Sequence, residues 1–536
     1  MFLIKDVDFP SNNYGLEPYL MNWPMLYILE NGRKAYVGQT NSIVKRMNQH
    51  SESIVKREFT RAHFIYSDRF NQSATFDYES RLIGLMSADR QFVLTNLNAG
   101  ITGIDYYDKA SYDTEFLELW RDLQQKKLVK HTIDELEQSD LFKYSPYKSL
   151  TDEQRRIVSE IVDNLRKSLD RRIVVGGMPG SGKTILAVYL FKLLRECPEF
   201  AGLKIGMVVP PSSLRGTLKE VFKSVNKLSV KDVLGPNDVT KEEYDILIVD
   251  EAHRLKMCKN LANYNSYYDA CDRLGLPHTS TQLDWIMKQT KCAILFFDRD
   301  QIVFPMGIDV GQAFQNNESE TRMMIYYTLL SQMRCKGGIK YLDDIKALIH
   351  GNIFHKVCSD NYEIRIVDDF QTFEDIFRIK EKRYGLTRMV AGYAWKWNSK
   401  NDKSAIDIEI EGYKKRWNSV LDNWVHSDNA INEVGCIHST QGYDLNYGFV
   451  ILGEDIKYDP VNKKVYIDRD CYFDRYGQQG ASDEELDEYI KNIYYVLMSR
   501  GVKGTYLYVC DEQLRRYISQ YVDTVPNVDE SNNADK

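Results

Sequence analysis

The sequence predicts an α/β protein in which a small N-terminal α/β domain is followed by two lobes built on parallel sheets. Three observations lead to this prediction: a β-prone hairpin pattern near the N-terminus, a helical stretch after it, and two successive series of short apolar runs. Short continuous apolar runs are typical of strands that are buried on both faces of a parallel sheet. Two such series indicate two lobes, and the interface between lobes is the expected place for a nucleotide.

The predicted elements follow in order along the chain. Two apolar runs, Met25–Leu29 and Ala35–Gly38, flank a polar turn with an Asn-Gly pair, which is a strong hairpin signal. From Ser111 to about Leu141, apolar residues recur at three- and four-residue spacing, which predicts a helical connector. The predicted lobe strands are Ile173–Gly176, Ile205–Pro210, Ile246–Val249 and Ala293–Phe297 in the first series, and Glu363–Val367, Thr387–Gly392, Gly435–His438, Phe449–Leu452 and Thr505–Val509 in the second.

These elements divide the chain into five predicted segments. The N-terminal domain is expected at residues 1–105 and the helical connector at 106–149. The two lobes are expected at 150–340 and 341–524, and a flexible tail at 525–536.

Composition excludes several classes of protein. With 43% hydrophobic and 27% charged residues, the chain of 536 residues has enough apolar side chains for real cores. The net charge of −7 excludes a globally basic nucleic-acid binder, so such a surface has to be a local basic patch. The nine cysteines have no metal-ligand spacing, which predicts reduced thiols in a cytoplasmic protein. No apolar run approaches about 18 residues, so no membrane partner is expected.

The strongest single motif is a phosphate-binding loop of the pattern GxxxxGK[ST]. It follows an apolar strand and opens a helix, as the motif requires, whereas a chance glycine-rich turn has neither neighbour. Backbone N–H groups of such a loop approach phosphate, the lysine reaches the β- and γ-phosphates of ATP, and the hydroxyl ligates Mg²⁺. The residues with these roles are Gly177, Pro179, Gly180, Ser181, Gly182, Lys183 and Thr184.

A second motif is an apolar strand that ends in two carboxylates, Asp250 and Glu251. Downstream of a phosphate-binding loop, this pattern suits an Asp250 that holds Mg²⁺ and a Glu251 that polarises the attacking water. The alternative is a solvated acidic loop. His253 is either a residue that couples the site to its surroundings or a capped loop histidine.

Further segments decide the type of ATPase. LTDEQ, PPSSLRGTL, FFDRDQ, LLSQMRC, GCIHSTQGYD and YYVLMSRGVKGTYLYV occur in this order over about residues 145–515. In this order they resemble the motifs of superfamily 1 helicases, whose lobes are RecA-like, and in particular the DUF2075 branch related to the helicase-like part of Schlafen proteins. The resemblance implies that Gln154 reads the adenine edge and that Gln301 senses the γ-phosphate. It also implies that Arg334 and Arg500 are arginine fingers. Gln441 and Gly442 would couple the nucleotide cleft to the nucleic-acid track.

The N-terminal hairpin resembles a GIY-YIG nuclease over about residues 22–100. Met25-Leu26-Tyr27 and Tyr36-Val37-Gly38 stand at the two triplets, with Met25 in place of the first glycine. The residues that follow in the expected order are Arg46, His50, Glu79 and Asn96.

This resemblance implies Mg²⁺-dependent cleavage of phosphodiesters. Glu79 would ligate the metal, Arg46 would neutralise the developing charge, and Tyr27 or Tyr36 would position or deprotonate water with help from His50. The alternative is that both tyrosines are half-buried sheet residues and that Glu79 is a surface acid. A basic band supports contact with nucleic acid, and it consists of Lys34, Lys45, Arg46, Lys56, Arg57 and Arg61.

Together the motifs predict an ATP-dependent nuclease with a helicase-like motor that acts on nucleic acid, DNA rather than RNA, in restriction or anti-phage defence. A nuclease gated by an ATPase switch without unwinding, and a scaffold with one inactive module, are the alternatives. A protein partner or a homo-oligomer is compatible with each. The tryptophans of the second lobe form either a base-stacking track or core packing, and they are Trp395, Trp397, Trp417 and Trp424.

Overall fold

The computed structural model describes residues 2–11, 14–96, 100, 106–137, 139–147, 150–225, 227–261, 263–305, 307–308, 323–357, 359, 361–420, 423–440 and 442–525. The chain forms two compact units. The first comprises Met1–Lys167, Thr184–Met207 and Arg215–Val233, and the second comprises Ser168–Lys183, Val208–Leu214 and Leu234–Lys536.

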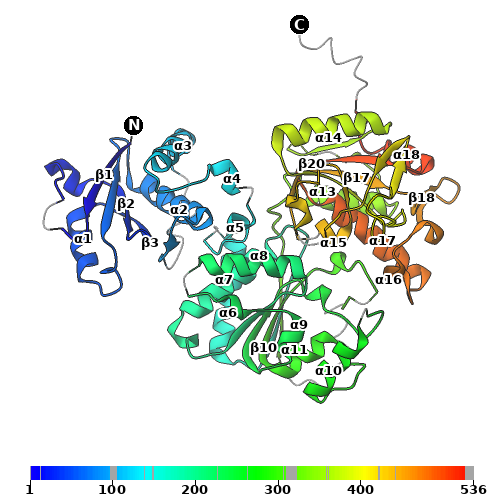
Figure 1. Ribbon diagram of the computed structural model, residues 1–536, viewed down its shortest axis with the longest axis horizontal. Coiled ribbons are helices and arrows are strands. Elements are labelled where there is room, and N and C mark those ends of the chain that lie inside the picture. Colours follow the sequence, from blue (N-terminus) through cyan, green and yellow to red (C-terminus); the bar gives the residue numbers. More distant parts are fainter. Residues whose placement is uncertain are drawn as a thin grey trace, which may run out of the picture. The chain divides into compact units, whose positions relative to one another are not determined.

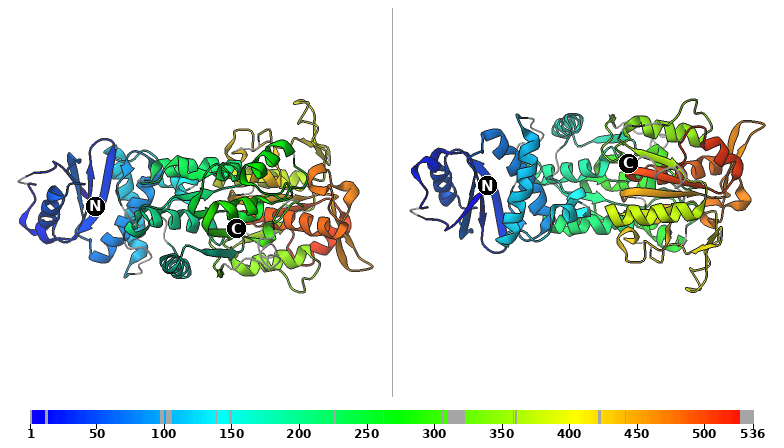
Figure 2. Two further views of the ribbon diagram at one scale, coloured as in Figure 1. Left: turned by 90° about the horizontal axis from the view of Figure 1, so that it is seen from below. Right: turned by 90° about the horizontal axis from the view of Figure 1, so that it is seen from above.

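A five-stranded sheet in the order β1-β4-β2-β3-β5 forms the N-terminal part of the first unit. Neighbouring strands are antiparallel except β3 and β5, which are parallel. Helix α1 lies on one face of this sheet and α2 on the other (Figures 1 and 2), so the central strand β2 is buried along its whole length. The bounds are Leu3–Asp8 for β1, Met25–Glu30 for β2, Lys34–Thr40 for β3, Arg61–Tyr66 for β4, Val93–Leu94 for β5, Ile43–Glu52 for α1 and Gln72–Asp89 for α2.

Strands β2 and β3 form the predicted hairpin, and their register places Tyr27 opposite Gly38. The ring of Tyr27 occupies the space over this glycine, because a Cβ atom at Gly38 would lie 2.3 Å from both Cζ and Oη of Tyr27. Tyr27 is fully buried, whereas Tyr36 on the same face is half-buried. The hairpin register therefore brings the two tyrosines together, with ring centroids 6.2 Å apart.

Helices continue the first unit after this sheet. The connector predicted from Ser111 to about Leu141 contains α3 at Lys109–Gln125, α4 at Ile133–Glu137 and α5 at Asp140–Lys143. Tyr78 of α2 packs edge-on against Phe116 of α3 at 5.0 Å, and its hydroxyl donates to the carbonyl of Tyr112 at 2.6 Å. These buried contacts hold α3 against α2.

The first lobe is built on a six-stranded sheet in the order β11-β6-β10-β9-β7-β8. Strands β9, β10, β6 and β11 are parallel, so their carboxyl ends lie at one edge. The four predicted strands of this lobe are present, while the sequence missed β8 and β11. The bounds are Arg171–Gly177 for β6, Ile205–Val208 for β7, Val233–Leu234 for β8, Tyr244–Val249 for β9, Thr290–Phe297 for β10, Met323–Leu329 for β11, Asp152–Lys167 for α6, Lys183–Glu196 for α7, Ser212–Ser224 for α8, Pro236–Val239 for α9, Tyr264–Leu274 for α10 and Gln282–Gln289 for α11.

The second lobe is built on an all-parallel sheet of five strands in the order β12-β20-β17-β13-β16. The predicted α/β class with two parallel-sheet lobes is therefore confirmed. The bounds are Glu363–Ile366 for β12, Thr387–Ala391 for β13, Val434–Gly435 for β16, Leu445–Leu452 for β17, Gly501–Val509 for β20, Gly338–Ile349 for α13, Phe370–Tyr384 for α14, Ile437–Thr440 for α15, Arg475–Gln478 for α16, Asp483–Met498 for α17 and Glu512–Ile518 for α18.

One expectation for this lobe needs correction. The predicted strand Gly435–His438 is wrong in extent, because the chain turns into α15, where the hydroxyls of Ser439 and Thr440 donate to the carbonyl of Cys436. The segment after Asp455 contains an antiparallel hairpin. Its strands are β18 at Ile456–Asp459 and β19 at Lys464–Ile467.

Aromatic packing fills the second lobe. Trp417 and Trp424 are almost fully buried, and Trp417 packs against Trp395 and Trp397 with centroids 6.5 Å and 6.1 Å apart. This arrangement favours core packing over a base-stacking track. Eight of the nine cysteines lie in described residues, each as a free thiol. Among the described helices, none has the length and apolar character needed to cross a bilayer.

Substitution of Gly38 by alanine tests the packing at the hairpin. The new Cβ atom would overlap the buried ring of Tyr27, so we expect Gly38→Ala to destabilise β2 and β3 by about 1–3 kcal/mol, as for other overpacked core sites. Faster amide hydrogen exchange in residues 25–40, followed by mass spectrometry, measures this effect.

Gly202→Ala is the matched control in the same unit, since a Cβ atom there meets no heavy atom within 4 Å. Equal exchange of residues 25–40 in the two variants would contradict the packing argument.

Candidate nucleotide and nuclease sites

The phosphate-binding loop lies at the carboxyl end of β6 and is closed tightly. Gly180 and Gly182 have φ values of +83° and +82°, a region that side-chain-bearing residues rarely adopt. A Cβ atom at Gly177 would lie 2.5 Å from Oγ of Ser181. The amide of Gln332 donates to the carbonyl of Pro179. The positive φ values and the neighbouring side chains therefore favour glycine at these positions.

Lys183 is buried inside the loop. Its ammonium group donates to the carbonyl oxygens of Gly177 at 2.7 Å and Met178 at 2.9 Å, and it forms an ion pair with Asp298 at 3.1 Å. Asp298 follows β10, at the same edge of the sheet as the loop. The sequence analysis did not single out Asp298, although its position just after a buried parallel strand was a usable signal.

The acidic pair follows β9 at this edge. Asp250 is fully buried, and its backbone N–H donates to the carbonyl of Val208 at 3.0 Å. Glu251 adopts a φ of +54° and contacts Nε2 of His253 at 2.9 Å. Burial would raise the pKa of Glu251, but the hydrogen bond to His253 and the charge of Lys183 hold this pKa below its usual range. Glu251 is therefore a carboxylate at neutral pH.

His253 lies between two acidic residues. Its Nε2 atom faces Glu251, and its Nδ1 atom accepts from the backbone N–H of Asp298 at 3.3 Å. The side chain is fully buried. This placement suits the coupling role better than a capped loop histidine.

A chain of side chains connects the loop to the second lobe. The carboxamide of Gln301 donates to Asp298 at 2.7 Å, and Arg500 donates from Nη2 to Oε1 of Gln301 at 3.1 Å. Arg500 immediately precedes β20 and is 1% exposed. Lys183, Asp298, Gln301 and Arg500 thus form one continuous polar chain from the first lobe to the second.

Two further residues expected at the nucleotide, Arg334 and Gly442, lie beside the loop and beside Arg500. A Cβ atom at Gly180 would lie 2.7 Å from Cβ of Arg334, and Arg500 donates to the carbonyl of Tyr443, next to Gly442, at 3.4 Å. Arg334 forms an ion pair with Asp444, and its backbone N–H donates to Gln332 at 2.7 Å. Gly442 has a φ of +96° in the same segment as Asp444, while Gln441 lies outside the described residues.

Two further expected residues belong to the first unit. Gln154 is fully buried, and its Oε1 atom accepts from the backbone N–H of Thr151 at 3.1 Å, which caps the start of α6. Thr184 is the second residue of α7, directly after Lys183.

The second candidate site lies on the N-terminal hairpin and α1. The hydroxyl of Tyr27 is 2.8 Å from Nε2 of His50, and it accepts from Nε of Arg46 at 3.1 Å. Since Arg46 can only donate, the phenolic proton of Tyr27 is directed to His50. Burial, together with the charges of Arg46 and Lys56, lowers the pKa of His50 to about 4. His50 is therefore a neutral acceptor at neutral pH.

The two tyrosines differ in environment. Burial raises the pKa of Tyr27 well above its ordinary value, and the neighbouring Tyr36 raises it further. The pKa of Tyr36 is also raised by burial, but the charge of Arg46 opposes this effect. Tyr27 thus serves to hold Arg46 and His50, and the half-exposed Tyr36 is the more accessible phenol.

Glu79 on α2 completes this cluster. Burial raises the pKa of Glu79 to about 7, while a hydrogen bond from the backbone of Gln39 and the charge of Arg46 oppose the shift. Within the described ranges, no group of three or more histidine, cysteine, aspartate or glutamate side chains is arranged to hold a metal. Among the residues of this cluster, Glu79 is the carboxylate that could hold a divalent ion.

Lys56 and Asn96 support the cluster. The ammonium group of Lys56 lies 3.0 Å from the ring centroid of Tyr36, whereas the sequence placed Lys56 only in a basic band. Burial and the charge of Arg46 lower the pKa of Lys56 to about 7. Asn96 accepts from the N–H of Val37 at 3.0 Å and donates to its carbonyl at 2.7 Å. Asn96 thereby fixes the strand that carries Tyr36.

Several known proteins are similar to this chain in sequence or in structure. A curated protein of Saccharomyces cerevisiae, "Uncharacterized protein YPL245W", is 25% identical over 423 residues, which cover 68% of this chain and 90% of that protein. The crystal structure of Pif1 helicase from Candida albicans has a TM-score of 0.28 and 12% identity, with 69% of this chain and 97% of that chain covered. The crystal structure of a DNA replication initiation factor has a TM-score of 0.20 and 16% identity. The match covers 34% of this chain and about half (49%) of the length of that factor.

These structural likenesses are weak, and the assignment does not depend on them. A family model described as "Schlafen group 3, DNA/RNA helicase domain" matches residues 170–511, more than half of the chain, and thus includes the phosphate-binding loop and Arg500. The GIY-YIG and DUF2075 resemblances stay predictions, and the N-terminal hairpin precedes the matched region. The chain belongs to the Schlafen group 3 DNA/RNA helicase domain family.

Proposed function

We propose that this protein hydrolyses ATP in a helicase-type motor that acts on nucleic acid, DNA rather than RNA, and that its N-terminal domain cleaves phosphodiesters of the same substrate. The proposed motor activity rests on the continuous series of polar side-chain contacts from Lys183 through Asp298 and Gln301 to Arg500. It joins the phosphate-binding loop to an arginine of the second lobe, which is the connection that a nucleotide-driven movement of two lobes requires. Membership of a helicase family supports the same reading.

The loop fits the phosphates of ATP. Its positive φ values and the lack of room for Cβ atoms leave backbone N–H groups as the groups that approach an anion. Lys183 would exchange its carbonyl and Asp298 contacts for the β- and γ-phosphates, and Asp250 and Thr184 would hold Mg²⁺. The bound Mg²⁺ would supply positive charge to the phosphoryl oxygens.

Three further residues would act on the attacking water and on the charge of the γ-phosphate. Glu251, an ionised carboxylate held by His253, would orient the attacking water and accept its proton. Gln301 would sense the γ-phosphate, and Arg500 would stabilise the charge that develops on it. Because Gln301 contacts both Asp298 and Arg500, loss of the γ-phosphate would change the partners of all three side chains.

Removal of the second-lobe arginine tests the motor. An arginine finger contributes about 10³–10⁵ in rate, so we expect Arg500→Ala to lower the kcat of ATP hydrolysis in the presence of DNA by a factor in or near this range. Steady-state release of phosphate measures this effect.

Arg516→Ala is the control, because Arg516 is exposed on α18 and its side chain pairs with nearby Glu512. An Arg500→Ala protein that hydrolyses ATP at the wild-type rate would remove Arg500 from the catalytic site.

The N-terminal cluster favours phosphodiester cleavage as a second activity. Glu79 would hold one Mg²⁺, whose charge stabilises the pentacovalent phosphate. Arg46, held by Tyr27, would neutralise a non-bridging oxygen. Tyr36 would position the attacking water or, in its phenolate form, accept the proton of this water. The ammonium group of Lys56 over the ring of Tyr36 would oppose the rise in the pKa of Tyr36 that burial causes.

Loss of the single carboxylate tests the nuclease. We expect Glu79→Ala to abolish Mg²⁺-dependent nicking of supercoiled plasmid, and Tyr36→Phe to lower it by about 10²–10⁴, the range of a general acid–base group. Gel analysis of plasmid and single-stranded DNA measures both effects.

Glu52→Ala is the matched control, since Glu52 is an exposed carboxylate at the end of α1. ATP hydrolysis by each variant reports whether the protein is folded. Cutting that persists in Glu79→Ala would exclude this site. A wild type that hydrolyses ATP but never cuts would favour the switch or scaffold reading.

A further inference from the structure

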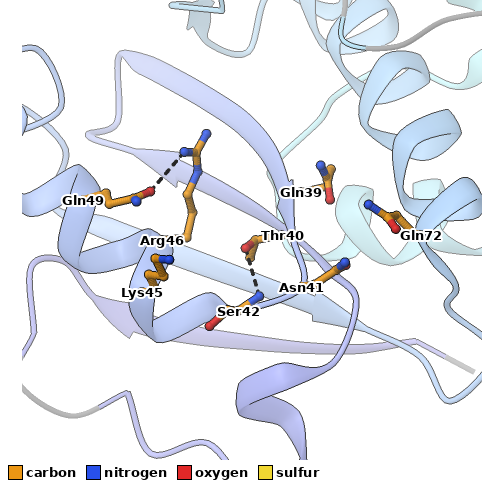
Figure 3. Close-up of a pocket in the computed structure, with 8 residues that line it drawn as sticks. All are labelled: Gln39, Thr40, Asn41, Ser42, Lys45, Arg46, Gln49 and Gln72. Carbon is orange, nitrogen blue, oxygen red and sulfur yellow. Dashed lines mark hydrogen bonds between the residues drawn. The ribbon is translucent and has the colours of Figure 1, made fainter.

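A polar cavity of about 380 Å³ lies beside the nuclease cluster. Figure 3 shows that its walls come from the end of β3, from α1 and from the first residue of α2. The volume falls in the range of small-ligand pockets. None of the lining side chains is acidic or apolar, and the cations and carboxamides among them are Lys45, Arg46, Gln39, Asn41, Gln49 and Gln72.

Arg46 joins this cavity to the tyrosine cluster. Its Nε atom donates to Tyr27 at 3.1 Å, while its Nη1 atom donates to Oε1 of Gln49 at 3.3 Å. Gln39 also lines the cavity, and its backbone lies close enough to the carboxylate of Glu79 to oppose the rise in the pKa of Glu79. A phosphate held at Arg46 and Glu79 would therefore place the attached nucleotide at the mouth of the cavity.

The lining chemistry distinguishes a base from a phosphate. A phosphate oxygen only accepts hydrogen bonds, so two cations are sufficient for it and carboxamide carbonyls add nothing. A nucleobase edge presents donors and acceptors side by side, and a carboxamide matches both. Four carboxamides in one cavity, without an acidic side chain to repel the backbone, fit a base attached to its phosphate.

We infer that this cavity holds the nucleotide next to the scissile phosphate, with Arg46 and Lys45 at the phosphate and the carboxamides at the base edge. The inference rests on the proposed nuclease activity. Adenine is the expected base, because a glutamine or asparagine side chain pairs with its N6 and N7 atoms in a bidentate manner.

The test uses the full-length protein and a DNA library with random sequence. The positions of the cuts made with Mg²⁺ and ATP are read by sequencing for wild type, Gln72→Ala and Asn41→Ala. Both residues are exposed, and the contacts of Tyr27 described above are made by Arg46 and His50, so the substitutions leave that cluster intact. Asn48→Ala is the control, since Asn48 is an exposed carboxamide of α1 outside the cavity.

We expect wild type and Asn48→Ala to prefer adenine at one position beside the cut by about tenfold, within the discrimination of one good carboxamide–base pair, and Gln72→Ala or Asn41→Ala to flatten this preference. A wild type without any base preference would overturn the inference. So would a preference that neither cavity variant changes.

A DNA-binding assay tests the inference if the wild-type protein does not cut DNA. If wild type cuts nothing, the proposed cleavage fails. The inference is then decided by fluorescence anisotropy with an oligonucleotide that carries one adenine and with its abasic counterpart, without Mg²⁺. Tighter binding of the adenine form that Gln72→Ala removes would support the cavity as a base site, whereas equal binding of both forms would overturn it.

Discussion

The buried ion pair between Lys183 and Asp298 is the contact on which the nucleotide site depends. A lysine ammonium with 6% of its side chain exposed needs a compensating charge, and Asp298 provides it. The same carboxylate accepts from Gln301, and the backbone N–H of Asp298 donates to His253. A single residue after β10, Asp298, therefore contacts Lys183, Gln301 and His253, the partner of Glu251. An arriving polyphosphate would compete for Lys183. Nucleotide binding would therefore change the contacts of Asp298 and, through Gln301, those of Arg500 in the second lobe.

The N-terminal cluster depends on a different constraint, which is the absence of a side chain at Gly38. The space over this glycine holds the ring of Tyr27, and Tyr27 in turn holds Arg46 and His50. Both sites thus place a cation by means of a buried partner: Asp298 after β10 holds Lys183, and Tyr27 on the central strand β2 holds Arg46. They differ in exposure, because Tyr36 and the polar cavity beside Arg46 are open to a polymer substrate.

Much of the fold could be predicted because it depends on local patterns. Continuous apolar runs located the central parallel strands, and the spacing of Gly177 to Thr184 located the loop. Strand β11 was not predicted because it lies at a sheet edge, where its residues are mostly exposed or half-buried and form no continuous apolar run. The strand expected at Gly435–His438 was cut short by hydroxyl groups that bond to the carbonyl of Cys436. Asp298 and Lys56 were not recognised as site residues, since their partners lie 115 and 20 positions away in the chain and no local pattern joins them.

The central claim is that one protein couples ATP turnover to cleavage of nucleic acid. The most direct test compares the rate of plasmid cleavage by wild type and by Lys183→Ala, each with Mg²⁺ and each with and without ATP. Coupling predicts that ATP changes the rate of wild type and that Lys183→Ala cuts at one rate in both conditions. Wild-type cleavage that is the same with and without ATP, in a protein that hydrolyses ATP, would contradict the account.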